Sequence, residues 1–122
     1  MLSLNVVLAQ HDPAAVSALV NNLRGQCRAV TLAEKAQLRH ALLKARANVA
    51  VLDLEMFSLP EIQEICQEFT NVSVVCTHRL ADDELWTNVM NVGAADCCLP
   101  TDVTGILFAV RRYAALARGT AA

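Results

Sequence analysis

Short apolar runs, each followed by a longer stretch with helical periodicity, divide this chain of 122 residues from end to end. Runs that are both short and continuously apolar are typical of strands buried on both faces of a sheet. Because such strands alternate with helices, the pattern indicates an α/β fold with a parallel sheet and right-handed crossovers. The strands are expected over residues 4–9, 27–32, 49–52 with Asp53 at its end, 72–76 and 94–99.

The helical stretches carry start and stop signals. Asp12 can N-cap the first helix, which has Pro13 at its first position. Gly93 stops the fourth helix. The later helices are expected over residues 34–46, 60–69, 82–92 and 103–116. A chain of this length has no room for a second domain. We therefore expect a single domain over residues 1–122, with its core at about 4–118.

Charge and hydropathy exclude several classes of protein. The chain has 12 acidic and 10 basic residues and a net charge of −2, whereas a free-standing nucleic-acid-binding domain usually carries a basic surplus. No apolar run approaches the roughly 18 residues that span a bilayer, and the amino terminus lacks the basic segment of a signal peptide. We expect no contact with nucleic acid or membrane and a cytoplasmic location.

The cysteines are odd in number and irregular in spacing, which argues against a disulfide framework and for reduced thiols. They are Cys27, Cys66, Cys76, Cys97 and Cys98. Cys76 and the vicinal pair Cys97–Cys98 fall in neighbouring expected strands, so two thiols could lie close together. Buried cysteine behaves mostly as a small hydrophobic residue, so core packing is the main expectation and redox sensing the alternative.

Polar residues cluster where the expected strands end, which is where parallel sheets bind ligands. They are Gln10, His11 and Asp12 after the first strand, Asp53 after the third, Thr77 and His78 after the fourth, and Pro100 after the fifth. No set of nucleophile, base and orienting group is complete among them, so we do not expect an enzyme. His11, His78 and Asp53 could meet as a transition-metal site, although such coincidences are frequent at strand ends.

The order of elements and three sequence landmarks resemble a receiver domain of bacterial response regulators. The landmarks are Val-Leu-Asp53-Leu-Glu-Met, Val-Val-Cys-Thr77-His and Gly93-Ala-Ala-Asp-Cys-Cys-Leu-Pro100. The resemblance covers residues 4 to about 118. It implies a flavodoxin-like, three-layer (β/α)5 fold, a doubly wound sheet of five parallel strands. It also implies that Asp53 is the equivalent of the phosphoacceptor and that Thr77 is the hydroxyl that contacts the phosphoryl group.

Other positions depart from the pattern of that family. Its chemistry needs Mg²⁺ on acidic residues after the first strand and a lysine after the fifth. The acidic pair is Gln10–His11 here, without the oxygen ligands that Mg²⁺ prefers, and Asp12 is better placed as an N-cap. The lysine position is Pro100, and the position of the switch aromatic is Cys97. We therefore predict a degenerate (pseudo-) receiver domain in which Mg²⁺ binding is lost or weak.

Three functions follow from this interpretation. The first is a phosphorylation-independent signalling and protein-interaction module. The second is a receiver domain that a histidine kinase still phosphorylates on Asp53. The third is a ligand, metal or thiol sensor that uses the altered pocket. If no phosphate is taken up, Asp53 is a partly solvated loop carboxylate that pairs with His11 and favours its charged form, and Thr77 bonds the local backbone.

The resemblance also implies an interaction face made by the fourth helix, fifth strand and fifth helix, through which receiver domains bind partners or form homodimers. Its residues here are Trp86, Met90, Asp96, Arg111 and Arg112. Trp86 and Met90 are spaced i, i+4 beside the core stripe of their helix, and both residue types are enriched at interfaces. The alternatives are that Trp86 covers the edge of the core and that the charges are only solvated.

Overall fold

The computed structural model describes residues 4–121 and the side chains of residues 4–113. All strands lie parallel in one five-stranded sheet with the order β2-β1-β3-β4-β5, which confirms the predicted fold class. The strands are β1 (Asn5–Ala9), β2 (Arg28–Leu32), β3 (Val49–Asp53), β4 (Ser73–Thr77) and β5 (Asp96–Cys98).

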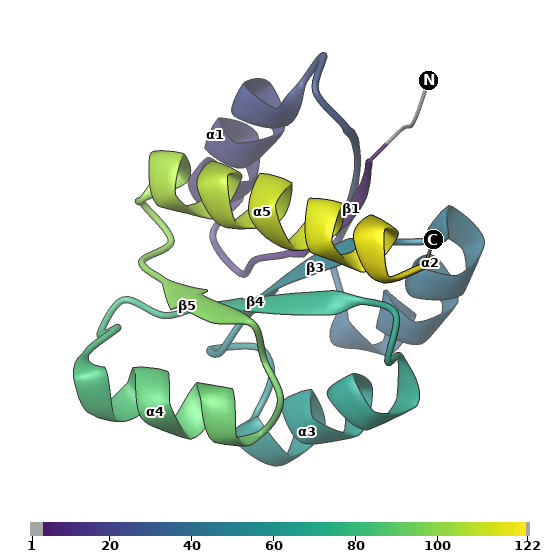
Figure 1. The fold of residues 1–122 in the computed structure, drawn as a ribbon. Coiled ribbons are helices and arrows are strands. Elements are labelled where there is room, and N and C mark those ends of the chain that lie inside the picture. Colours follow the sequence, from purple (N-terminus) through teal and green to yellow (C-terminus); the bar gives the residue numbers. More distant parts are fainter. Residues whose placement is uncertain (1–3, 122) are drawn as a thin grey trace.

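Helices cover both faces of the sheet, as Figure 1 shows: α1 and α5 lie on one face, and α3 and α4 on the other. The helices are α1 (Pro13–Leu23), α2 (Leu38–Ala45), α3 (Leu59–Glu68), α4 (Asp83–Asn91) and α5 (Val103–Ala121). The chain runs from β1 to the edge strand β2 and then returns to place β3 on the other side of β1. The strand order therefore reverses between β1 and β3, the position at which such sheets form a ligand crevice.

Each face of the sheet has its own apolar core. Successive residues of a strand point to opposite faces, so Val51 packs with Ile106 of α5 while Leu52 packs with Ile62 of α3. Every residue of β3 is buried, because this central strand is covered on both sides. The continuous apolar runs of the sequence are thus explained by strands that have no solvent-facing side.

Two predicted helices differ from the observed ones. The segment expected as one helix over 34–46 begins with a 3-10 turn, η1 (Lys35–Gln37), and α2 proper starts only at Leu38. Glu34 and Gln37 form a reciprocal capping box that closes this tight turn. The last helix extends to Ala121 rather than to residue 116. None of the described helices combines the length and apolar character needed to cross a membrane.

Candidate functional site

The reversal of strand order brings the polar strand ends together. Asp53 is the last residue of β3 and Thr77 the last of β4, and the two are partners in the parallel register. Gln10 and His11 follow β1 on the other side of β3. The crevice beside them has a volume of about 420 Å³ and extends to α1, Arg79 and Pro100. The parallel arrangement of β1, β3 and β4 thus brings Gln10, His11 and Thr77 to the same edge of the sheet as Asp53.

The carboxylate of Asp53 is buried and held by three donors. Its Oδ2 accepts the main-chain N–H of His11 at 3.0 Å, its Oδ1 accepts the main-chain N–H of Glu55 at 2.8 Å, and the imidazole of His11 also contacts Oδ2. Only 2% of Asp53 is exposed, so the expectation of a partly solvated loop carboxylate is wrong. Burial acts to raise the pKa of Asp53, but these hydrogen bonds outweigh it and lower the pKa.

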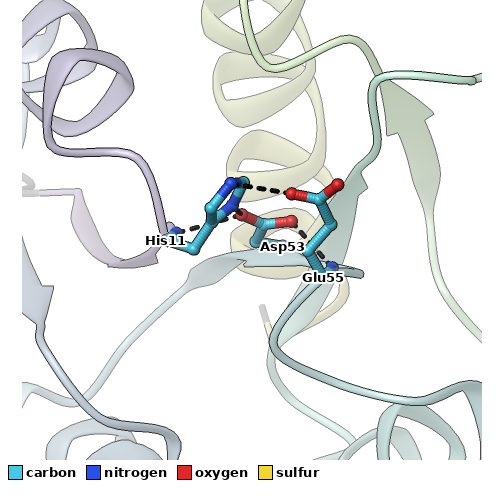
Figure 2. A group of neighbouring side chains, drawn as sticks. All are labelled: His11, Asp53 and Glu55. Carbon is cyan, nitrogen blue, oxygen red and sulfur yellow. Dashed lines mark hydrogen bonds and ion pairs between the residues drawn. The ribbon is translucent and has the colours of Figure 1, made fainter.

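The imidazole of His11 lies between two carboxylates, as Figure 2 shows. Its Nδ1 contacts Asp53 Oδ2, and its Nε2 lies 2.7 Å from Glu55 Oε2. A ring that donates from both nitrogens is an imidazolium. The hydrogen bond to Asp53, together with the charges of the surrounding carboxylates, raises the pKa of His11 despite its partial desolvation. The surroundings of His11 therefore favour the positively charged form of its ring beside Asp53.

Glu55 completes this site, although sequence reasoning assigned it no role. Its Oε1 lies 3.2 Å from Nε of Arg79, so Arg79, Glu55, His11 and Asp53 form a chain of alternating charge. The Arg79 end is largely exposed to solvent and contributes little to stability. The only available sequence signal was that Glu55 stands two residues after Asp53, and that spacing does not determine where its side chain points.

Gln10 and Thr77 bond to each other beneath this chain of charges. The Thr77 hydroxyl donates to Gln10 Oε1 at 3.1 Å, and Gln10 Nε2 donates to the main-chain oxygen of Ala9 at 3.1 Å. Both Gln10 and Thr77 are buried. The expectation that Thr77 bonds the local backbone is therefore wrong, because the long side chain of Gln10 reaches across β3 to supply the acceptor.

The remaining strand-end residues do not join the group around Asp53. His78 Nδ1 accepts the main-chain N–H of Leu80 at 3.0 Å, so its ring is held within its own loop. Among the described residues, the cluster with metal-ligand spacing is His11, Asp53 and Glu55, whose ligand atoms lie within 4.8 Å of one another. The predicted grouping of His78 with His11 is thus wrong.

The two residues that flank the crevice have different surroundings. Asp12 N-caps α1 by accepting the main-chain N–H of Ala14 at 3.0 Å, as its spacing from Pro13 predicted. Pro100 lines the crevice and brings neither charge nor an N–H group to it.

The thiols of β4 and the edge strand β5 pack against the apolar cores, and their burial favours the protonated form. Cys76 and Cys97 are register partners and pack on the same face of the sheet, while Cys98 packs on the opposite face. Burial is the main cause that raises the pKa of Cys97 to about 11 and that of Cys98 to about 12, and it raises the pKa of Cys76 further. Because only the thiolate reacts readily, these cysteines have the character of packing residues.

On α4, the stripe that packs into the core is separate from the side that carries Trp86. Val89 is buried, whereas 47% of Trp86 is exposed and Met90 is partly buried. The other residues of the predicted interaction face have polar surroundings: Asp96 Oδ1 accepts the N–H of Cys97 at 2.8 Å, Arg111 and Arg112 are exposed, and the Arg112 guanidinium lies 5.6 Å from the ring centroid of Tyr113.

Comparison with known proteins identifies the fold and nothing finer. No protein-family model and no curated protein matches the chain. Among solved structures, it is similar to the N-terminal signal receiver domain of a response regulator from Bacteroides fragilis, with 20% identity, a TM-score of 0.82 and coverage of 93% of this chain and 98% of that chain.

Two further structures have the same architecture. A response regulator from Thermotoga maritima gives 20% identity, a TM-score of 0.83 and coverage of 93% of this chain and 99% of that chain. A CheY-like receiver domain protein from Methanospirillum hungatei gives 11% identity, a TM-score of 0.83 and coverage of 98% and 99%. The likeness extends over whole domains, and this chain therefore has the fold of the receiver domains of two-component response regulators.

Proposed function

We propose that this chain is an atypical (pseudo-) receiver domain that works as a phosphorylation-independent signalling and protein-interaction module in the cytoplasm, without catalysing a reaction. The observation that supports this most directly is the position of His11. An imidazolium held between Asp53 and Glu55 neutralises the carboxylate and covers it. The charge that a receiver domain would obtain from a metal ion is here part of the polypeptide.

The residues around Asp53 do not fit Mg²⁺. This cation needs a near-octahedral set of oxygen ligands. His11 offers N–H donors and a positive charge at the point where a cation would approach Asp53, and the amide oxygen of Gln10 is already bonded to Thr77. Both carboxylate oxygens of Asp53 also accept main-chain N–H groups. Binding of Mg²⁺ would have to break several of these bonds, so we expect it to be absent or weak.

Phosphoryl transfer to Asp53 is disfavoured for the same reasons. An attacking carboxylate oxygen must be free, and the developing charge on the phosphoryl oxygens must be compensated. Asp53 is 2% exposed and hydrogen-bonded at both oxygens. Pro100 supplies no charge, and the Thr77 hydroxyl is used by Gln10. Phosphorylation by a histidine kinase is therefore the alternative that the first experiment must exclude.

That experiment is incubation with acetyl phosphate and Mg²⁺, followed by intact-mass measurement, and in parallel beryllofluoride with Mg²⁺ followed by amide NMR spectra. We expect no covalent adduct and no shift of the amides around Asp53. The matched control is the triple variant Gln10→Glu, His11→Asp and Pro100→Lys, which restores the acids and the lysine that the resemblance implies. An adduct on the natural chain that disappears in Asp53→Asn would establish the alternative instead.

For the interaction itself, we propose the surface of α4, β5 and α5 as the contact with a signalling partner or a second copy. Trp86 would be the anchor, because it is a large aromatic side chain with 47% of its surface exposed, and tryptophan is enriched among the residues that contribute most to binding. Sedimentation at several concentrations, alone and with candidate signalling proteins, tests this surface with the variant Trp86→Ala. Leu43→Ala is the control, since Leu43 is 68% exposed on α2. Association that is equal in both variants would exclude Trp86 as the anchor.

The sensor alternative has a separate test. His11, Asp53 and Glu55 together offer nitrogen and oxygen ligands of the kind that Zn²⁺ accepts. We expect the melting temperature to be the same with Zn²⁺ and with a chelator, because a metal would have to displace an N–H proton that His11 donates to Asp53 or to Glu55. A rise with Zn²⁺ that is lost in Glu55→Gln would favour the sensor.

A further inference from the structure

A second groove lies along the edge strand β2, away from Asp53. It has a volume of about 840 Å³, twice that of the crevice beside Asp53, and the two share no lining residue. β2 forms the floor and the outer flank of α2 forms the wall, because α2 packs mainly over β1 and leaves the edge of the sheet uncovered. Its apolar lining consists of Val30, Leu32, Ala36, Ala41 and Ala45.

Cationic side chains surround this apolar floor. Arg28, Lys44 and Arg46 line the groove together with His40, and no acidic residue lines it, although acids outnumber bases in the chain. None of the ion pairs in the described part of the chain involves these four residues. The groove therefore has a positive rim whose cations form no ion pair with the described residues.

The other flank of α2 and the turn before it have the opposite arrangement. Lys35 Nζ lies 2.9 Å from Glu61 Oε2, and Arg39 Nε lies 2.8 Å from Glu68 Oε1, so the cations that face α3 are paired. The cations that line the groove along β2 thus differ from those that face α3, because they form no ion pair with the described residues.

Arg46 ends α2 with a φ of 52°. This left-handed conformation favours glycine, because a Cβ atom makes it less stable. A long cationic side chain therefore occupies the rim of the groove at a position where the backbone alone would favour glycine.

The outer edge of β2 offers unpaired main-chain groups beside the groove. Among residues 4–121, β2 pairs with β1 alone, and the main-chain N–H of Arg28 donates to the main-chain oxygen of Leu4, in the chain segment that enters β1. In a parallel pair the N–H and C=O of one residue point to the same side and alternate along the strand. The main-chain groups of Arg28 and Val30 therefore face β1, and those of Ala29 and Thr31 face outward, where no other described segment pairs with them.

We propose that this groove binds an extended, acidic peptide segment of a partner protein, which adds to the sheet as a strand beside β2. Its main chain would pair with Ala29 and Thr31. Alternate apolar side chains would enter the groove over Val30 and Leu32, which share one face of the strand with Arg28. Acidic side chains on this same face of the added strand, an even number of residues from the apolar ones, would reach the rim formed by Arg28, Lys44 and Arg46.

Three features of the groove favour this occupant over others: the open strand edge, the apolar floor and the cationic rim. A small inorganic anion would use the cations and leave the apolar floor empty. A neutral apolar peptide would leave the uncompensated cations beside an apolar contact. Only an extended acidic chain uses the strand edge, the floor and the rim together. The site lies at the opposite edge of the sheet from β5. Peptide binding here can therefore be tested independently of the proposed contact around Trp86.

The test uses the full chain and a short, acetylated and amidated peptide with a fluorescent label. In this peptide valine and glutamate take turns at every second position, with threonine between them, so that both valine and glutamate face the groove. Binding is followed by fluorescence anisotropy, and the contact is located by amide NMR shifts. We expect saturable binding that weakens with added salt, with the largest shifts at Ala29 and Thr31. The same peptide with lysine in place of glutamate, and one with a central proline, should not bind.

Variants separate the contributions. The double variant Arg28→Glu and Lys44→Glu should weaken binding by at least about tenfold, which corresponds to about 1.4 kcal/mol. Lys44→Glu alone should already weaken binding, whereas the control Arg24→Glu reverses one charge at an exposed position just after α1 and should bind as the natural chain does. Thr31→Pro removes an outward N–H, a change that edge strands tolerate, and should also weaken binding.

Several outcomes would overturn the proposal. One is the absence of binding by the glutamate–valine peptide. Another is a combination of three results: charge reversal weakens binding, Thr31→Pro leaves it unchanged, and the peptide with proline binds equally well. Binding would then be simple charge attraction without strand pairing. A third is binding of pyrophosphate at these cations without binding of the peptide, which would make the groove a small-anion site.

Discussion

The hydrogen bond between Thr77 and Gln10 occupies the strand-end hydroxyl, so this hydroxyl is not available to a phosphoryl group on Asp53. Thr77→Val replaces the hydroxyl by a methyl group of similar size. Gln10 Oε1, which lies 3.1 Å from that hydroxyl in a buried environment, then loses its donor. A buried polar group left without a partner costs about 1–3 kcal/mol. For a chain of 122 residues this lowers Tm by about 4 °C for each kcal/mol.

The reciprocal change and the double change complete a thermodynamic cycle. Gln10→Met keeps the length of the side chain and leaves the Thr77 hydroxyl without its acceptor, so we expect a similar loss of about 1–3 kcal/mol. The double variant removes both polar partners, and replacement of both by apolar groups of similar shape is close to neutral. The double variant should therefore be about as stable as the natural chain, so the coupling energy equals the sum of the two single losses, about 2–6 kcal/mol.

Urea unfolding measures these free energies, with circular dichroism and the fluorescence of the single tryptophan, Trp86, as two independent probes. Coincident transitions establish that unfolding is two-state. The decisive quantity is the departure from additivity. If the two single losses simply add in the double variant, Thr77 and Gln10 are not partners in solution. The hydroxyl would then be available to a phosphoryl group, and phosphorylation of Asp53 would be less disfavoured.

Three further predictions concern the site and the core. The pKa of His11 is raised above its ordinary value of 6.5 and that of Asp53 is lowered below 3.8, so their pairing stabilises the fold most between these two pH values. That contribution is lost as pH rises through the folded-state pKa of His11, and also as pH falls through that of Asp53. Urea unfolding should therefore show a larger difference between the natural chain and His11→Gln within this window than well above it, and a constant difference would refute the pairing. Cys76 and Cys97 should resist iodoacetamide in the folded chain near neutral pH and react after unfolding. With a pKa of about 11, less than ~0.1% of Cys97 is thiolate at this pH. Rapid labelling of the native chain, detected by mass spectrometry, would favour the redox alternative. Ile106→Ala, at a fully buried position between α5 and the sheet, should cost about 2–5 kcal/mol in urea unfolding, and a loss below about 1 kcal/mol would mean that this core is loosely packed.

The architecture was predictable because it depends on properties that are local in the chain. Continuous apolar runs such as that of β3 mark strands buried on both faces, and their alternation with helices leaves few possible topologies. Errors arose where side chains compete with the regular backbone pattern. The capping box of Glu34 and Gln37 turns the start of an expected helix into a 3-10 turn, and helical periodicity alone does not distinguish the two.

The members of the candidate site were partly predictable, and their partners were not. Parallel strands end at one edge, so the neighbourhood of Gln10, His11, Asp53 and Thr77 follows from the fold. The orientation of each side chain does not follow from it. His78 turns toward Leu80 instead of His11, and no pattern in the chain indicates that choice.

The sequence by itself determined the parallel α/β fold, the position of Asp53 at a strand end, and the replacement of acids and lysine by Gln10, His11 and Pro100. Periodicity and residue type suffice for these statements, because burial and charge are properties of each position. Only the tertiary structure decided that His11 lies between Asp53 and Glu55 and that cations without partners line the groove along β2. Those facts depend on distances between segments far apart in the chain, which the packing of helices on the sheet sets.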